Sequence, residues 1–171
     1  VIFHEVAHGW TALKLGDPTA ARLGRLTMDP RPHIDPVMSL LVPAICILGG
    51  APIFGGAKPV PVNPSYFRRP SRDMAFVALA GPLSNLLLAF IFATGINLIQ
   101  ANGWMTAMLG GSIEIVAKVF SYGVFINLIL AAFNLLPIPP LDGSRVLAHF
   151  LKGQTARSFR NLDRYGMFLI L

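Results

Sequence analysis

The longest stretches without a charged residue place the strongest constraint on what this chain can fold into. Residues 37–57 and 74–100 contain no Asp, Glu, Lys or Arg, and residues 113–136 contain only Glu114 and Lys118. The hydrocarbon core of a bilayer is about 30 Å thick and a helix rises about 1.5 Å per residue, so roughly 20 apolar residues can cross it. Charged residues make up 13% of the chain, about half the share found in soluble domains. We therefore expect an all-α polytopic membrane protein.

The apolar runs predict a bundle of about four transmembrane helices. We expect a single domain over residues 1–171 that is truncated at both ends, because apolar residues begin and end the chain. Prolines and paired glycines interrupt residues 37–57. Alternating prolines in residues 58–64 exclude a helix and impose a short extended segment. The expected helices cover residues 1–15, 74–100, 113–136 and a last segment that starts near residue 166.

The net charge of +6 could indicate a nucleic-acid partner, but the placement of the basic residues argues against one. They gather in three polar segments, whereas residues 101–112 contain none. The positive-inside rule predicts such segments on the cytoplasmic side, next to anionic lipid headgroups. We expect a multi-pass protein of the cell membrane, with the lipid bilayer as a partner and no nucleic acid. The basic residues of these segments are Arg22, Arg25, Arg31, Lys58, Arg68, Arg69, Arg72, Arg145, Lys152, Arg157, Arg160 and Arg164.

A His-Glu-x-x-His pattern, HEVAH, stands in the first apolar segment. On a helix, His4 and His8 share one face and can bind one zinc ion, while Glu5 projects beside it towards a bound water. Zinc lowers the pKa of that water to roughly 7, and the carboxylate can take its proton. The alternative is a histidine pair held by hydrogen bonds in a helix bundle. Ionisable residues in a membrane segment are costly, which favours the metal site.

A catalytic zinc site needs a third protein ligand and an open position. Asp142 follows a proline-rich run, residues 137–141, and precedes Gly143, so its backbone is held rigidly and can approach closely. We therefore favour Asp142 over an ordinary loop carboxylate. The other candidates stand among turns or basic residues, and we expect surface histidines at His33 and His149. We expect solvated loop charges at Asp17, Asp29, Asp35, Asp73 and Asp163.

Three motifs together resemble the site-2 protease family of intramembrane zinc metallopeptidases. They are HEVAH at residues 4–8, AGPLSN at residues 80–85 and NLLPIPPLDG at residues 134–143. Their order and spread over most of the chain make the resemblance specific. The short segment at residues 58–64 is similar to the bacterial branch that lacks a PDZ insertion.

The resemblance implies a role for each matching residue. His4, His8 and Asp142 would bind one Zn²⁺, and Glu5 would be the general base. Asn134 matches the family asparagine that holds the substrate backbone, and such a donor could also stabilise the oxyanion. For Asn85 the resemblance implies helix packing or support of the site.

The positions of these residues predict a topology. Asp142 follows the third long helix beside a basic segment, so the active site should open towards the cytoplasm. Residues 37–57 would then start and end on that same side. We therefore expect a re-entrant segment there, which is tolerated where protein or a wet cavity satisfies the backbone.

The leading interpretation is an intramembrane metalloendopeptidase that cuts a protein substrate in or near a transmembrane segment. The main alternative is a metal-binding membrane protein without proteolysis, such as a transporter or sensor, although Glu5 has little use in transport. A soluble zinc protease fragment is disfavoured by the uncharged run at residues 74–100. Residues 58–64 would clamp an unwound substrate by β-addition or merely link two helices. Residues 152–164 would lie in the membrane interface or in solvent. A homo-oligomer is compatible with this interpretation.

Overall fold

The computed structural model describes residues 1–50, 55–101, 103, 107–108, 110–155 and 159. Within these residues every regular element is a helix and there is no strand, which confirms the all-α expectation. The main helices are α1 (Ile2–Lys14), α2 (Thr19–Arg22), α3 (Val42–Leu48), α4 (Pro70–Ala101), α6 (Ile113–Asn134) and α7 (Asp142–Phe150). Short turns are η1 (Arg31–His33), η2, a π-helix (Pro36–Leu41), η3 (Pro64–Tyr66) and η4 (Gly110–Ser112).

Two helices are long and apolar enough to cross a membrane. They are α4, with 32 residues, and the continuous helical stretch Gly110–Asn134, with 25 residues, which contains α6. In the described part of the chain only these two qualify, against about four expected. The helix α1 has 13 residues, and the expected helix near residue 166 lies outside the described residues. The re-entrant segment stays a prediction, because residues 51–54 within it are also outside them.

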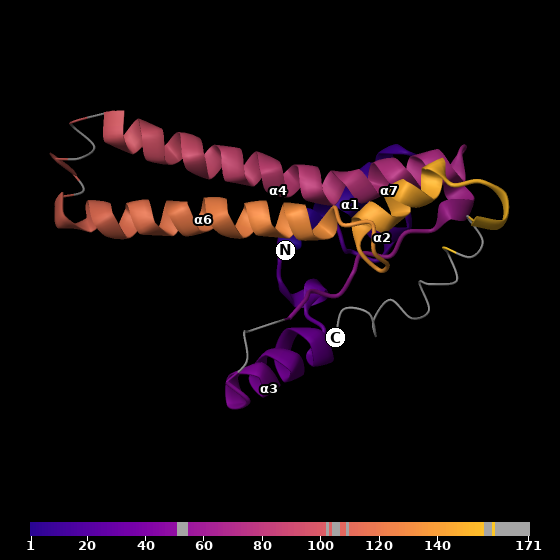
Figure 1. Cartoon of the computed structure of the whole chain (residues 1–171), viewed down its shortest axis with the longest axis horizontal. Helices are drawn as coiled ribbons and strands as arrows, with labels where there is room; N and C mark the ends of the chain where they lie inside the picture. Colours follow the sequence, from indigo (N-terminus) through magenta and orange to yellow (C-terminus); the bar gives the residue numbers. More distant parts are fainter. Residues whose placement is uncertain (51–54, 102, 104–106, 109, 156–158, 160–171) are drawn as a thin grey trace.

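The helices α4 and α6 form the long axis of the molecule (Figure 1). They lie side by side and run in opposite directions, while α1, α2 and α7 gather at the end where α4 begins and α6 ends. The ring of Phe92 packs over Gly123, and the ring of Phe120 packs over Gly95. The two rings meet edge to face with centroids 5.6 Å apart. Glycines thus let two bulky rings interdigitate, which is a common way to bring membrane helices close together.

The helix α4 begins four residues earlier than expected because Asp73 caps it. The Asp73 carboxylate accepts the backbone N–H of Arg69 at 3.0 Å and pairs with the guanidinium of Arg72 at 2.7 Å. Asp73 is 2% exposed, so the expectation of a solvated loop charge was wrong. A buried carboxylate is tolerable here because several donors satisfy it.

Asp17 was also wrongly expected to be a solvated charge, since it is fully buried. Its carboxylate accepts the backbone N–H of Thr19 at 2.9 Å at the start of α2, and that of Asn63 at 2.6 Å. The second bond joins the α1–α2 turn to the proline-rich segment. We call residues 58–63 the strap.

The strap contains no helix and no strand, as expected from its alternating prolines, and the backbone of its last residue, Asn63, is extended. Besides Asp17, a buried arginine holds it: Nη2 of Arg25 donates to the carbonyl of Lys58 at 2.8 Å. The backbone N–H of Lys58 donates to the carbonyl of His33 at 2.8 Å. The strap is therefore fixed to the α1–α2 region rather than free in solvent.

The glycine contacts between α4 and α6 generate a stability prediction. In Gly123→Ala the new Cβ would lie 2.8 Å from ring carbons of Phe92. Overpacking of this kind costs about 1–3 kcal/mol, more than the gain in helix propensity of up to about 1 kcal/mol. We expect a lower unfolding midpoint in detergent. The control is Gly111→Ala, where a Cβ meets nothing within 4 Å; equal midpoints for the two variants would contradict the packing described.

Candidate active site

Three side chains from two distant parts of the chain converge at the end of the bundle where α4 begins and α6 ends. His4 and His8 stand one turn apart on α1, and Asp142 is the first residue of α7. His4 Nε2 lies 3.0 Å from His8 Nε2 and 3.1 Å from Asp142 Oδ2, and His8 Nε2 lies 3.3 Å from the same oxygen. All three residues are at least nine-tenths buried. Three potential ligand atoms therefore face one point.

This arrangement fits a zinc ion. Ligand atoms about 2.0–2.2 Å from a tetrahedral zinc stand roughly 3.3 Å from one another, close to the separations here. Among the described residues, these three form a group whose ligand atoms lie close enough together to hold one metal ion. Asp142 Oδ2 is buried without a hydrogen bond of good geometry, which is costly unless a cation balances it. Two imidazoles and a carboxylate are also a donor set that suits zinc.

Asp142 is held in its ionised form. Burial raises the pKa of Asp142, but the His4 and His8 rings, whose Nε2 atoms lie 3.1 and 3.3 Å from Oδ2, outweigh it and lower the pKa to about 2. The carboxylate is therefore charged at neutral pH, as a metal ligand must be. Asp142 lies outside the two apolar helices, eight residues after the end of α6.

The backbone of α4 orients His8. His8 Nδ1 lies 2.6 Å from the carbonyl oxygen of Val77. A carbonyl only accepts, so Nδ1 carries the hydrogen and donates it, and Nε2 keeps its lone pair for a metal. About two turns further along α4, the carboxamide of Asn85 lies 3.1 Å from His4 Nδ1. Asn85 is 1% exposed, so it is buried in contact with His4.

Gly81 makes room for both imidazoles, and sequence reasoning missed this role. A Cβ at Gly81 would lie 2.5 Å from His4 Nε2 and from His8 Cε1. Val77, Gly81 and Asn85 are spaced by four residues, so one face of α4 serves both histidines. That spacing is the signal in the sequence that could have indicated the glycine. The next residue, Pro82, has no backbone N–H, so it cannot donate the usual helical hydrogen bond to the carbonyl four residues earlier.

Glu5 lies beside the three ligands and is tied to the strap. Its Oε2 accepts the backbone N–H of Val60 at 2.9 Å. The residues on either side of Val60 are prolines and have no N–H to offer. One carboxylate oxygen is thus held, and the other has no hydrogen bond among the described residues.

Two cavities flank the site and share three of its residues. One of about 470 Å³ extends along α6, with Ile129 and Phe133 in its wall, and one of about 160 Å³ lies under the strap. His4, Glu5 and Asn134 line both. The Asn134 Nδ2 donates one hydrogen to the carbonyl of Leu130 at 2.8 Å, so its second N–H is available to a ligand. Asn134 thus borders the site without touching His4, His8 or Asp142, which we call the triad.

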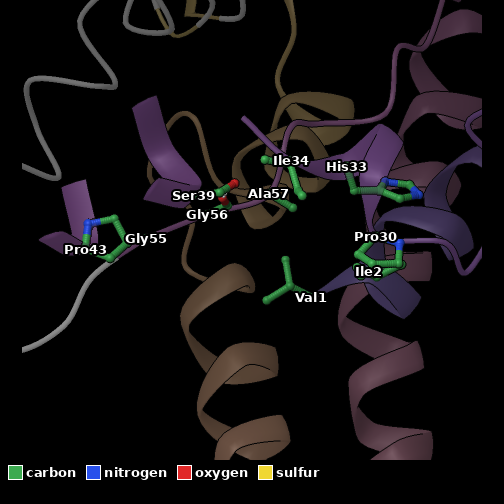
Figure 2. Close-up of a pocket in the computed structure, with 10 residues that line it drawn as sticks. All are labelled: Val1, Ile2, Pro30, His33, Ile34, Ser39, Pro43, Gly55, Gly56 and Ala57. Carbon is green, nitrogen blue, oxygen red and sulfur yellow. Dashed lines mark hydrogen bonds between the residues drawn. The ribbon is translucent and has the colours of Figure 1, made fainter. Parts of the chain in front are cut away.

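The remaining histidines do not join the triad. His33 was expected at the surface, but it is 2% exposed and its Nε2 lies 3.0 Å from the carbonyl of Thr27. Figure 2 shows it at the edge of a separate pocket of about 290 Å³ beside Val1 and Ser39, to which no residue of the triad contributes. His149, at the end of α7, contacts the hydroxyl of Ser71 at 3.1 Å and ties α7 to α4.

A buried His-Glu-x-x-His helix, a carboxylate from a second helix and apolar helices around them define the class of helical zinc metallopeptidases. The model of "Peptidase family M50" matches residues 1–171, and the chain belongs to this family. The resemblance to the site-2 proteases is thereby confirmed.

Individual relatives agree with the family. The chain is 38% identical over 169 residues to "Putative zinc metalloprotease YwhC" of Bacillus subtilis, covering 98% of this chain and 73% of that protein. It is 33% identical over 169 residues to "Putative zinc metalloprotease Rip2" of Mycobacterium tuberculosis, covering 98% of this chain and 60% of that protein. The chain therefore spans about three fifths of the length of Rip2. No solved structure matches it.

The close approach at Gly81 predicts the effect of a single methyl group on metal binding. In Gly81→Ala the imidazoles must move apart, and overpacking of about 1–3 kcal/mol corresponds to roughly 5- to 150-fold weaker zinc binding. Competition with a chelator of known affinity measures this. The control is Gly95→Ala, the same change on the same helix, where the new Cβ would press on Phe120 instead. Equal zinc affinity in the two variants would contradict the described geometry.

Proposed function

We propose that this chain is the catalytic part of an intramembrane zinc metalloendopeptidase, which hydrolyses a peptide bond in or near a transmembrane segment of a protein substrate. The observation that carries the proposal is the position of Glu5, whose carboxylate stands beside three converging ligand atoms and between two cavities. His4, His8 and Asp142 would hold one Zn²⁺. The apolar helices α4 and α6 would place this site within reach of the bilayer.

The chain's own residues would divide the work of hydrolysis. When bound, zinc supplies a Lewis acid that polarises a carbonyl and makes a water molecule acidic. The free oxygen of Glu5 would take a proton from that water and pass it to the leaving amine. The Val60 N–H fixes the other oxygen, so the carboxylate does not have to reorient during this transfer. The second N–H of Asn134 would hold the substrate carbonyl and stabilise the charge that develops on it.

The two cavities suggest the path of the substrate. The larger one is bordered by apolar side chains of α6, which suits a transmembrane segment, and the smaller one contains Arg145. The scissile bond would lie between them, where His4, Glu5 and Asn134 meet. Because the segments that carry Arg145 and the strap are basic, we place this end of the molecule at the cytoplasmic face.

The strap offers only part of an edge for substrate pairing. In residues 59–62, all of which the structure describes, the only N–H groups belong to Val60 and Val62. That of Val60 is used by Glu5, and the carbonyls of Lys58 and Pro59 accept from Arg25. In an extended segment residues two apart face the same edge. A substrate strand on this edge would therefore pair with Val62.

Two conservative variants separate proteolysis from mere metal binding. In full-length protein in detergent, we expect Glu5→Gln to keep zinc and to lose at least about 100-fold in cleavage of a model transmembrane substrate, because the base is absent. We expect Asp142→Asn to weaken zinc binding, because the amide is not an anionic ligand. Cleavage by Glu5→Gln at the wild-type rate would contradict the proposed base. Metal binding without any cleavage by the wild type, with ion transport in liposomes, would favour a transporter.

Matched proline substitutions test the two valines of the strap. Val60→Pro creates three consecutive prolines, Val62→Pro creates two, and each removes one N–H. Val60→Pro should lower kcat about 10- to 100-fold with zinc retained, because a hydrogen bond to a charged group is worth about 1.5–3 kcal/mol. Val62→Pro should instead raise KM if the substrate pairs with the strap. An unchanged kcat in Val60→Pro would show that the strap does not orient Glu5.

A further inference from the structure

The buried carboxamide of Asn85 faces the one ligand histidine whose tautomer the backbone does not fix. His8 is fixed because a carbonyl accepts from its Nδ1. His4 Nδ1 instead faces Asn85 Nδ2 at 3.1 Å, and an amide can act either as donor or as acceptor. The tautomer of His4 therefore depends on which end of the amide it meets.

Each orientation of the carboxamide selects one tautomer of His4. With its nitrogen towards Nδ1, the amide donates, and the imidazole hydrogen must sit on Nε2. With its oxygen towards Nδ1, the amide accepts, the hydrogen sits on Nδ1, and Nε2 keeps a free lone pair. Only the second tautomer can ligate a metal through the Nε2 that faces His8 and Asp142.

The surroundings of Asn85 allow the carboxamide to turn. Its Oδ1 is buried and has no hydrogen-bond partner among the described residues. A rotation of 180° about the last side-chain bond exchanges the oxygen and nitrogen, which have nearly the same shape. No hydrogen bond of Oδ1 is broken by this rotation, and a new one from His4 Nδ1–H is formed.

We propose that Asn85 is a positioning residue that selects the metal-binding tautomer of His4, with its amide oxygen accepting the Nδ1–H hydrogen. The inference rests on the proposed metal site and gives Asn85 a role beyond helix packing. It also explains why the polar side chain of Asn85 is 1% exposed within the uncharged part of α4. Asn85 acts through His4 and does not touch the reacting atoms.

Two substitutions at Asn85 distinguish an acceptor from a filler of space. Aspartate keeps the shape and can only accept, so Asn85→Asp should bind zinc within about threefold of the wild type or more tightly. Leucine is similar in size and cannot accept, so Asn85→Leu should bind zinc about 10- to 100-fold more weakly, the usual loss when the partner of a ligand histidine is removed. Zinc competition with a chelator measures both, in full-length protein. The visible absorption of the Co²⁺ form reports the ligand geometry.

The control is Ser84→Ala on the same helix, whose hydroxyl bonds the carbonyl of Gly81 at 2.6 Å without contacting the triad; it should bind zinc like the wild type. Asn85→Asp binding as weakly as Asn85→Leu would overturn the proposal, even if Asn85→Leu were poorly folded. Wild-type affinity in folded Asn85→Leu would overturn it too. Because zinc affinity is read apart from cleavage, failure of the proposed protease activity would be seen separately, in the wild type.

Discussion

The convergence of two imidazoles and one carboxylate inside an apolar helical bundle is the interaction on which the rest of the structure depends. Polar groups buried among apolar helices are costly unless each has a partner. Here the three ligand atoms face one another, and their outer sides meet the Val77 carbonyl and the Asn85 amide. A cation at their centre would balance the charge of Asp142. The bundle is thus arranged around its polar centre.

The helix α4 supplies the support for this centre. At intervals of four residues it presents a carbonyl to His8, an empty space at Gly81 and an amide to His4. The strap completes the arrangement from the other side, where Val60 holds the carboxylate of Glu5. Through Asp17 and Arg25 the strap is anchored to the α1–α2 region. Catalytic geometry would therefore depend on residues that are far from one another in the sequence.

Much of this could be predicted from the sequence, because the strongest signals are local. Uncharged runs predicted α4 and α6, and the His-Glu-x-x-His spacing placed two imidazoles on one face. The proline run before Asp142 indicated a rigid approach, and the structure brings that residue to the histidines. The start of α4 was missed because a carboxylate four residues away caps it.

The remaining features depend on contacts between distant segments. The helix α7 is not among the helices expected from the sequence, because no long apolar run marks it and its packing on α4 is a contact between distant segments. The burial of Asp17 and His33 follows from bonds to the strap and to the loop after α2, which composition does not reveal. The role of Gly81 is visible only once two imidazoles are placed against it.

The most direct test of the central claim is the zinc X-ray absorption spectrum of the full-length protein. The account predicts one zinc ion per chain with nitrogen and oxygen ligands at about 2.0–2.1 Å, two of them imidazoles, and no sulfur. A sulfur shell at about 2.3 Å would implicate Cys46, the one cysteine of the sequence, instead. That result, or three or more imidazoles in the shell, would contradict a site made of His4, His8 and Asp142.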